Sequence, residues 1–251
     1  MLFPLGGFAQ TKKFQVDTDG TLTTNLVSYY KLEDANDFWS TNNLTPAGDA
    51  SFVVGKVNNA VTLDGTGDWL EGGDVNEVGA TFSLFAWVKF PSLPSANNWV
   101  YGKDDDVNGR AYAFGVESAG HLNLQVNGVG SGALGNTVLS ANTWYFIGVT
   151  FDEATDAVQY FLNGTSDGTT TNTGVIPANT ALFDLGRRTY AGANEPWNGL
   201  IDEAGVWDKI LSATEITDLY NGGAGQTMWT GRRLFIISFL KSLMSWLNRL
   251  I

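Results

Sequence analysis

The run from Asn142 to Gly164, NTWYFIGVTFDEATDAVQYFLNG, constrains the fold more than any other part of the chain. Apolar side chains occupy both alternating sets of positions in Trp144–Phe151 and again in Ala157–Leu162. An acidic turn separates these two runs, and the second ends at Asn163-Gly164, a pair that favours a left-handed hairpin turn. Strands that are apolar on both faces are typical of the centre of a packed sheet. The segment therefore predicts two adjacent central strands of a β-sandwich.

Other segments extend this pattern. The run HLNLQVNG (121–128) predicts a one-sided strand, with Leu122, Leu124 and Val126 pointing inward and polar residues between them pointing outward. AVTLDG and GDWLEGG (60–73) suggest a hairpin around Gly65-Thr66-Gly67. Turn residues recur at the spacing expected of a sandwich. Near the end, Ser212 and Glu215 have capping-box spacing, which predicts a short helix to Tyr220.

Three phrases in a set order carry a family resemblance. They are TFSLFAWVKF (81–90), the 142–164 run and NGLIDEAGVWDKILSATEI (198–216). Together they resemble the LamG-like jelly roll of the concanavalin A-like lectin/glucanase superfamily. The resemblance implies an all-β fold, a two-sheet antiparallel jelly-roll sandwich, over about residues 25–225. Residues 1–24 would then be an N-terminal arm, and residues 226–251 a C-terminal amphipathic α-helix.

Composition narrows the classes of partner. The 251 residues include 14 basic and 26 acidic side chains, for a net charge of −12. Nucleic acid is not expected as a partner, because phosphate binding requires a basic surface. Cysteine is absent, which excludes disulfides and thiolate metal sites. We expect the protein on an extracellular surface or in a virion.

The sequence does not suggest catalysis. Glucanases of the superfamily carry acids at alternate strand positions, and retaining hydrolysis requires two carboxyl groups about 5–5.5 Å apart. No segment has that spacing, and Asp202 and Glu203 are adjacent, so alternation predicts that they face opposite sides of a sheet. We therefore predict that the protein is not an enzyme.

Two groups of oxygen ligands are candidates for a hard cation such as calcium. The first is Asp104, Asp105 and Asp106 with Asn108, for which a solvated acidic loop is the alternative. The second is Asp202 with a carboxylate from the first strand and loop, Glu33 or Asp34. In the superfamily an acid at the late-strand position often holds a structural calcium, so the resemblance implies this role for Asp202.

Sugar recognition would use exposed aromatic rings as stacking platforms. Trp87, Trp144 and Trp207 lie in the motif strands and are predicted to be core. The candidates for a ligand-binding rim, each of which could instead pack its own loop, are Trp99, Tyr101, Tyr190 and Trp197.

The C-terminal segment is apolar apart from one narrow polar stripe. In LFIISFLKSLMSWLNRLI (234–251) the polar residues recur at offsets of three and four, as on an amphipathic helix about 30 Å long. Such a helix must be buried by protein assembly, by a membrane interface or by its own domain. The residues assigned to this anchor are Arg232, Arg233, Leu234, Phe235, Phe239, Leu243, Trp246, Leu247 and Leu250.

These features predict a non-enzymatic, surface-displayed binding module for carbohydrate recognition or adhesion. It would bind a glycan or another surface ligand, form a homo-oligomer and be anchored through its termini in a larger assembly. The alternative is a virion structural protein, a phage capsid decoration, spike or fibre component, in which the sandwich is mainly scaffold.

Overall fold

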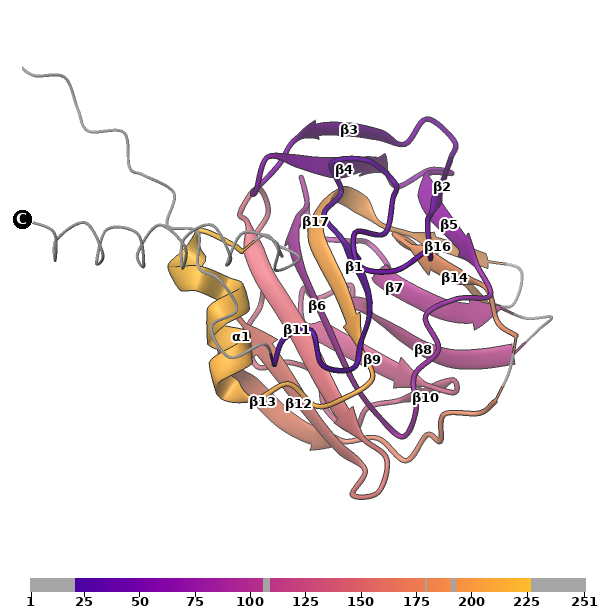
Figure 1. Ribbon diagram of the computed structural model, residues 1–251, viewed down its shortest axis with the longest axis vertical. Coiled ribbons are helices and arrows are strands. Elements are labelled where there is room, and N and C mark those ends of the chain that lie inside the picture. Colours follow the sequence, from indigo (N-terminus) through magenta and orange to yellow (C-terminus); the bar gives the residue numbers. More distant parts are fainter. Residues whose placement is uncertain (1–20, 106–108, 179, 191–192, 227–251) are drawn as a thin grey trace, which may run out of the picture.

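The computed structural model describes residues 21–105, 109–178, 180–190 and 193–226. Within these ranges the chain forms two antiparallel sheets that pack face to face, with one short α-helix on the outside (Figure 1). This arrangement confirms the predicted jelly-roll sandwich. The N-terminal arm and the C-terminal helix of the sequence prediction fall almost wholly outside the described residues.

The first sheet, sheet A, has the strand order β13-β12-β11-β6-β17-β4-β3, and β1 pairs with the second half of β17. The two adjacent strands that the 142–164 run predicted are β11 and β12; both are interior strands of sheet A, with β12 next to the edge strand β13. The strands of sheet A are β1 (Leu26–Tyr30), β3 (Ser51–Val54), β4 (Asn59–Asp64), β6 (Thr81–Lys89), β11 (Tyr145–Asp152), β12 (Ala157–Leu162), β13 (Thr165–Thr171) and β17 (Asn198–Trp207).

The second sheet, sheet B, has the order β10-β9-β8-β7-β14-β5-β2. A separate hairpin, β15 (Arg187–Tyr190) with β16 (Ala193–Pro196), follows β14. The strands of sheet B are β2 (Thr45–Ala47), β5 (Trp69–Gly73), β7 (Asn98–Asp105), β8 (Gly109–Val116), β9 (Leu122–Val126), β10 (Val129–Gly130) and β14 (Phe183–Leu185).

The hairpin predicted around Gly65-Thr66-Gly67 is wrong. β4 pairs with β3 and β17 in sheet A, whereas β5 pairs with β2 and β14 in sheet B. The turn between them therefore carries the chain from one sheet to the other. Alternation identifies a strand and its buried face, but it does not identify the neighbour, because Leu63 and Leu70 both enter the layer between the sheets.

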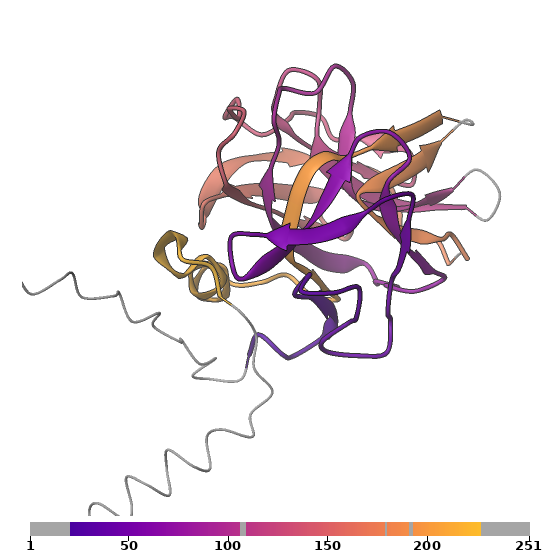
Figure 2. The ribbon, with the colours of Figure 1, turned by 90° about the horizontal axis from the view of Figure 1, so that it is seen from above.

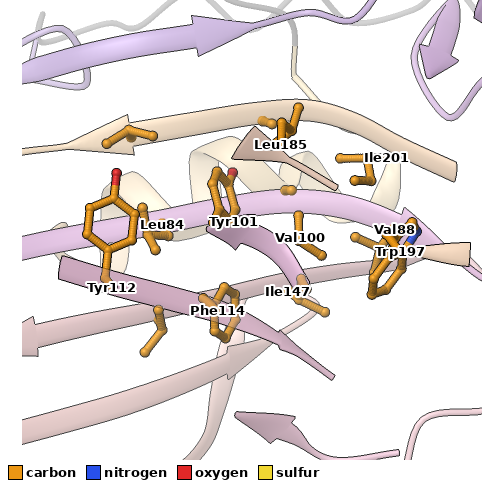
Figure 3. Close-up of a cluster of buried hydrophobic side chains, with 14 of the residues drawn as sticks. Leu84, Val88, Val100, Tyr101, Tyr112, Phe114, Ile147, Leu185, Trp197 and Ile201 are labelled. Carbon is orange, nitrogen blue, oxygen red and sulfur yellow. The ribbon is translucent and has the colours of Figure 1, made fainter. Parts of the chain in front are cut away.

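The middle strands of sheet A, β6, β11 and β17, are buried on both faces. The inner face of the sheet packs against sheet B through a large core that contains Leu84, Ile147 and Ile201 (Figure 3). Its outer face carries a second core, in which Trp87 and Trp207 pack with Leu26 and Ile216. Trp144 is only partly buried at the edge of this second core. The prediction of apolar strands with two buried faces is therefore confirmed.

The helix α1 (Ala213–Tyr220) covers the outer face of sheet A. Its N-cap is the predicted capping box: the Ser212 side chain accepts from the backbone N–H of Glu215, and the Glu215 carboxylate accepts from that of Ser212. In the described part of the chain no helix has the length and apolar character needed to cross a membrane. Figure 2 shows α1 and the β15–β16 hairpin on opposite sides of the sandwich.

Candidate functional site

The outer face of sheet B carries polar and charged side chains, in contrast to the apolar outer face of sheet A. In β9, Leu122, Leu124 and Val126 enter the core, so Asn123 and Gln125 face outward, as predicted. Across the sheet, Asn123 lies opposite Gly115 of β8 and Gln125 opposite Ala113. This outer face, from β5 to β9, is called the polar face below.

The β15–β16 hairpin lies against the polar face, with β15 above β7. A side chain at Gly102 would collide with the carbonyl oxygen of Arg187, at 2.2 Å from a Cβ placed there. Glycine at this position therefore permits the hairpin to approach. As a result, two consecutive arginines, Arg187 and Arg188, begin β15 directly over sheet B.

Arg188 is the hub of the polar face. Its Nη1 donates to Oε1 of Gln125 at 2.6 Å, and its Nε lies 3.3 Å from Oδ2 of Asp104. The guanidinium also lies over the Trp99 ring, 4.9 Å from its centre, and 3.6 Å from Oε2 of Glu195. The indole Nε1 of Trp99 donates to that same Glu195 oxygen at 2.7 Å. Arg188 is buried, so these contacts join two strands of sheet B, β7 and β9, and the hairpin into one rigid cluster.

Two further pairs complete the cluster. Arg110 of β8 donates through Nε to Oδ1 of Asp104 at 2.9 Å. Arg187 donates through Nε to Oδ2 of Asp184 at 2.8 Å and stacks on the Trp69 ring at 3.5 Å from its centre. All three guanidiniums of the polar face are therefore paired with carboxylates, which favours a rigid, preformed surface.

The predicted aromatic rim is wrong for three of its four residues. Trp99, Tyr101 and Trp197 are buried, with exposed fractions of 0%, 0% and 1%, so they cannot offer a ring to a ligand. Tyr101 and Trp197 point into the core between the sheets (Figure 3), where the Tyr101 hydroxyl donates to the carbonyl of Phe85 at 2.7 Å. Burial raises the pKa of Tyr101 well above its usual value. The side chain of Tyr190 lies outside the described residues.

The acidic loop predicted to bind a cation is also corrected. Asp104 and Asp105 belong to β7 rather than to a loop, and Asp104 is buried against Arg110 and Arg188. A carboxylate neutralised by two guanidiniums is poorly suited to hold calcium. The side chain of Asp105, and Asp106 and Asn108 altogether, lie outside the described residues.

The second predicted cluster, Asp202 with Glu33, does come together. Oδ2 of Asp202 accepts from the backbone N–H groups of Lys56 and Val57, both at 2.8 Å. Glu33 accepts from the Asn58 side chain at 2.7 Å and from the Asn59 backbone at 3.2 Å. Both carboxylates therefore hold the loop between β3 and β4. Burial raises the pKa of Asp202 to about 7; the backbone donors oppose this shift and the charge of Glu33 adds to it.

Asp202 and Glu203 do not obey simple alternation. A register shift interrupts β17 between Asp202 and Gly205, and Glu203 has a left-handed φ of 48°. The β-bulge inserts one residue, so both carboxylates lie toward the outer face of sheet A. Consistent with this, burial and then the charges of Glu203 and Asp202 raise the pKa of Tyr29, a residue of that face.

The structure reveals an acidic trio that the sequence analysis missed: Asp49, Asp64 and Asp68, whose carboxylate oxygens lie within 4.8 Å of one another. Asp68 is buried and accepts from the backbone N–H of Asp49 at 2.9 Å and of Asp64 at 3.2 Å. Burial alone would raise the pKa of Asp68, but these donors hold it below its usual value. The contact with Asp68 raises the pKa of Asp49. The trio could hold a metal ion, and LDGTGD (63–68) was the only local signal for it.

Fold and polar face together define a jelly-roll domain of the lectin type, with one sheet covered by a helix and the other carrying polar side chains. The chain belongs to the concanavalin A-like lectin/glucanase superfamily: a laminin-G family model with that description matches residues 64–217. A comparison with curated protein sequences found no match.

Solved structures of similar fold include binding domains and an enzyme. Domain 4 of AbnA, a GH43 extracellular arabinanase from Geobacillus stearothermophilus in complex with arabinotriose, aligns with a TM-score of 0.61 and 21% identity, over 77% of this chain and 97% of that one. A Trypanosoma rangeli sialidase mutant with trans-sialidase activity aligns with a TM-score of 0.62 and 14% identity, over 82% and 34%. The receptor binding domain of botulinum neurotoxin C/D mosaic serotype aligns with a TM-score of 0.58 and 14% identity, over 80% and 52%. At these identities the likeness concerns the fold.

Proposed function

We propose that this protein is a non-enzymatic carbohydrate-binding module that recognises glycans with the polar face of sheet B. The observation that carries the proposal is the preformed cluster centred on Arg188, which fixes the Gln125 amide and three guanidiniums on the polar face, with the half-buried ring of Trp69 stacked against Arg187. Sugar sites combine such fixed polar groups with aromatic surface. Domain 4 of AbnA, which matches nearly over its full length, is described in complex with arabinotriose, and this supports the same class of ligand.

A glycan array with the full chain tests the proposal. We expect binding that falls at least tenfold in Gln125→Ala, because Gln125 faces outward on β9 beside Arg188. Gln159→Ala is the matched control: Gln159 is also half-buried on a strand, but β12 belongs to sheet A. Absence of binding to any glycan, with or without calcium, would exclude the module. An equal loss in both variants would place the site elsewhere.

We further propose that calcium binds the acidic trio. Three carboxylates with one oxygen each in mutual contact range match the oxygen ligands that calcium prefers. The hydrogen bond with Asp68 and then the charge of Asp68 raise the pKa of Asp49, which indicates that like charges meet at this site. Calcium binding at Asp202 stays a separate prediction. The ammonium of Lys56 already lies near that carboxylate and would compete with a cation there.

The positions of Leu22 and Gln226, near the two ends of the sandwich, support display on a larger assembly. The carbonyl of Leu22 accepts from Nε1 of Trp207 at 2.7 Å, and that of Gln226 accepts from the Tyr29 hydroxyl at 2.9 Å. Because Trp207 and Tyr29 belong to the same core, both ends of the sandwich lie at the outer face of sheet A. Attachment through the segment 226–251, to protein or to a membrane, would therefore leave the polar face available.

A further inference from the structure

We infer that the polar face is built for neutral sugars and excludes acidic ones such as uronic or sialic acids. The inference rests on the proposed glycan-binding function and names the chemical class of its ligand. It follows because each guanidinium of the polar face is already paired with a carboxylate of the protein itself.

Each guanidinium on the polar face has a carboxylate partner from the protein itself. Arg110 and Arg188 share Asp104, Arg187 pairs with Asp184, and Arg188 also lies near Glu195. The remaining acid of this face, Glu71 on β5, is exposed. Three positive and four negative charges thus leave the described part of the face with no excess positive charge for an anionic ligand.

An acidic sugar would have to compete with a buried partner. Asp104 is 4% exposed and Arg188 is 3% exposed. If a ligand carboxylate took the Arg188 guanidinium, buried Asp104 would lose one of the two guanidiniums that neutralise it, and separating a buried pair in this way is unfavourable. The like charges of Asp104, Asp184 and Glu195 would also repel an incoming carboxylate.

The groups that remain open are neutral. Among the described residues, the Asn123 amide makes no hydrogen bond, and in Gln125 only Oε1 is used, by Arg188. Asn123 and Gln125 stand two residues apart on β9, so their amides lie on the same face of the sheet. Amides offer both donors and acceptors, which is what the hydroxyl groups of a neutral sugar require. Because Asn123 is 9% exposed whereas Gln125 is half-buried, we expect Gln125 to make the main contact with the ligand.

Asp104→Asn converts the inference into a gain-of-function test, because it retains side-chain shape while removing the carboxylate charge that Arg110 and Arg188 share. The full chain and the variant are compared on an array that contains neutral glycans and matched sialylated or uronic acid glycans, such as lactose and sialyllactose. We expect the wild type to bind neutral members at least tenfold more tightly than their acidic counterparts. We expect Asp104→Asn to bind acidic members at least tenfold better than the wild type does.

The outcomes separate the inference from the proposed function. Equal or tighter binding of acidic glycans by the wild type would overturn the inference and leave the glycan-binding function intact. Failure of a folded Asp104→Asn protein to gain acidic ligands would also overturn it. If Asp104→Asn does not fold, Asn123→Asp is the second variant, and it should weaken neutral binding without creating acidic binding. Absence of all glycan binding by the wild type would instead refute the proposed function itself.

Discussion

Asp202→Asn should stabilise the protein at alkaline pH, and the structure sets the size of the effect. Asp202 is fully buried, and its pKa of about 7 compares with an ordinary value of 3.8. A carboxyl group with a raised pKa binds more protons in the folded than in the unfolded state between these two values. Stability must therefore fall as pH rises from 4 to 7. One pKa unit corresponds to about 1.4 kcal/mol, so the ionised group costs roughly 4 kcal/mol above pH 7.

Asparagine removes this cost while retaining an oxygen for the N–H groups of Lys56 and Val57. Its amino group would replace Oδ1, which has no hydrogen-bond partner within the described residues. An unsatisfied buried donor costs about 1–3 kcal/mol. At pH 8 the free energy of unfolding of Asp202→Asn should exceed that of the wild type by about 1–3 kcal/mol. At pH 4 it should be lower than that of the wild type by the cost of the unsatisfied donor. Charges facing this site come from Glu33, Glu203 and Lys56, so the midpoint of the pH dependence reflects all of them.

The assay is urea unfolding of wild type and Asp202→Asn from pH 4 to pH 8 with EGTA, repeated with calcium. The wild type should lose stability across this range, and the variant should not. A wild-type free energy of unfolding that stays level or rises toward pH 8 would refute the reasoning. If calcium stabilises the wild type but not the variant, Asp202 is a calcium ligand and the raised pKa describes only the metal-free protein.

Three further predictions concern separate parts of the molecule. Calcium should raise the Tm of the wild type, and Asp68→Asn should abolish this rise because the buried member of the trio loses its charge; an unchanged rise would exclude the trio as the binding site. Ser212→Ala should lower the free energy of unfolding by about 1 kcal/mol, since it removes the N-cap of α1; Thr217→Ala, on the exposed side of the same helix, is the control and should cost less. A chain ending at Gln226 should lose any self-association or binding to anionic vesicles that the full chain shows in sedimentation; retention of both would exclude the C-terminal segment as the anchor.

Sequence pattern was sufficient where structure depends on local alternation. The double-sided apolar runs of β11 and β12, the one-sided β9 and the capping box of α1 each lie within a single element. The burial of each strand follows from its own side chains, because period two assigns them to faces. Alternation does not identify which strands pair with each other. For this reason β4 and β5 were wrongly predicted to form one hairpin.

The site was harder to predict because its members meet across long separations. Arg188 reaches Gln125, 63 residues away, and Asp49 meets Asp68 across 19 residues. The bulge at Glu203 changes the face of a side chain, and the residue that takes the left-handed φ there is a glutamate rather than a glycine. Trp99 and Trp197 were wrongly predicted for a related reason: segments distant from them in the sequence cover their rings in the folded chain. An aromatic residue beside a turn is therefore weak evidence for a ligand platform unless its neighbours in space are known.

Under the proposed function, the two sheets would divide the tasks of attachment and recognition. The outer face of sheet A is occupied by α1, by the Leu22 end and by the Gln226 end of the sandwich. The cluster around Arg188 lies on the other side of the core, on the polar face of sheet B. A partner attached beyond Leu22 or Gln226 would act on β17 and β1, whereas a ligand would contact β8, β9 and the β15–β16 hairpin. Mutations that disturb attachment should therefore leave glycan affinity unchanged, and mutations of the polar face should leave attachment unchanged.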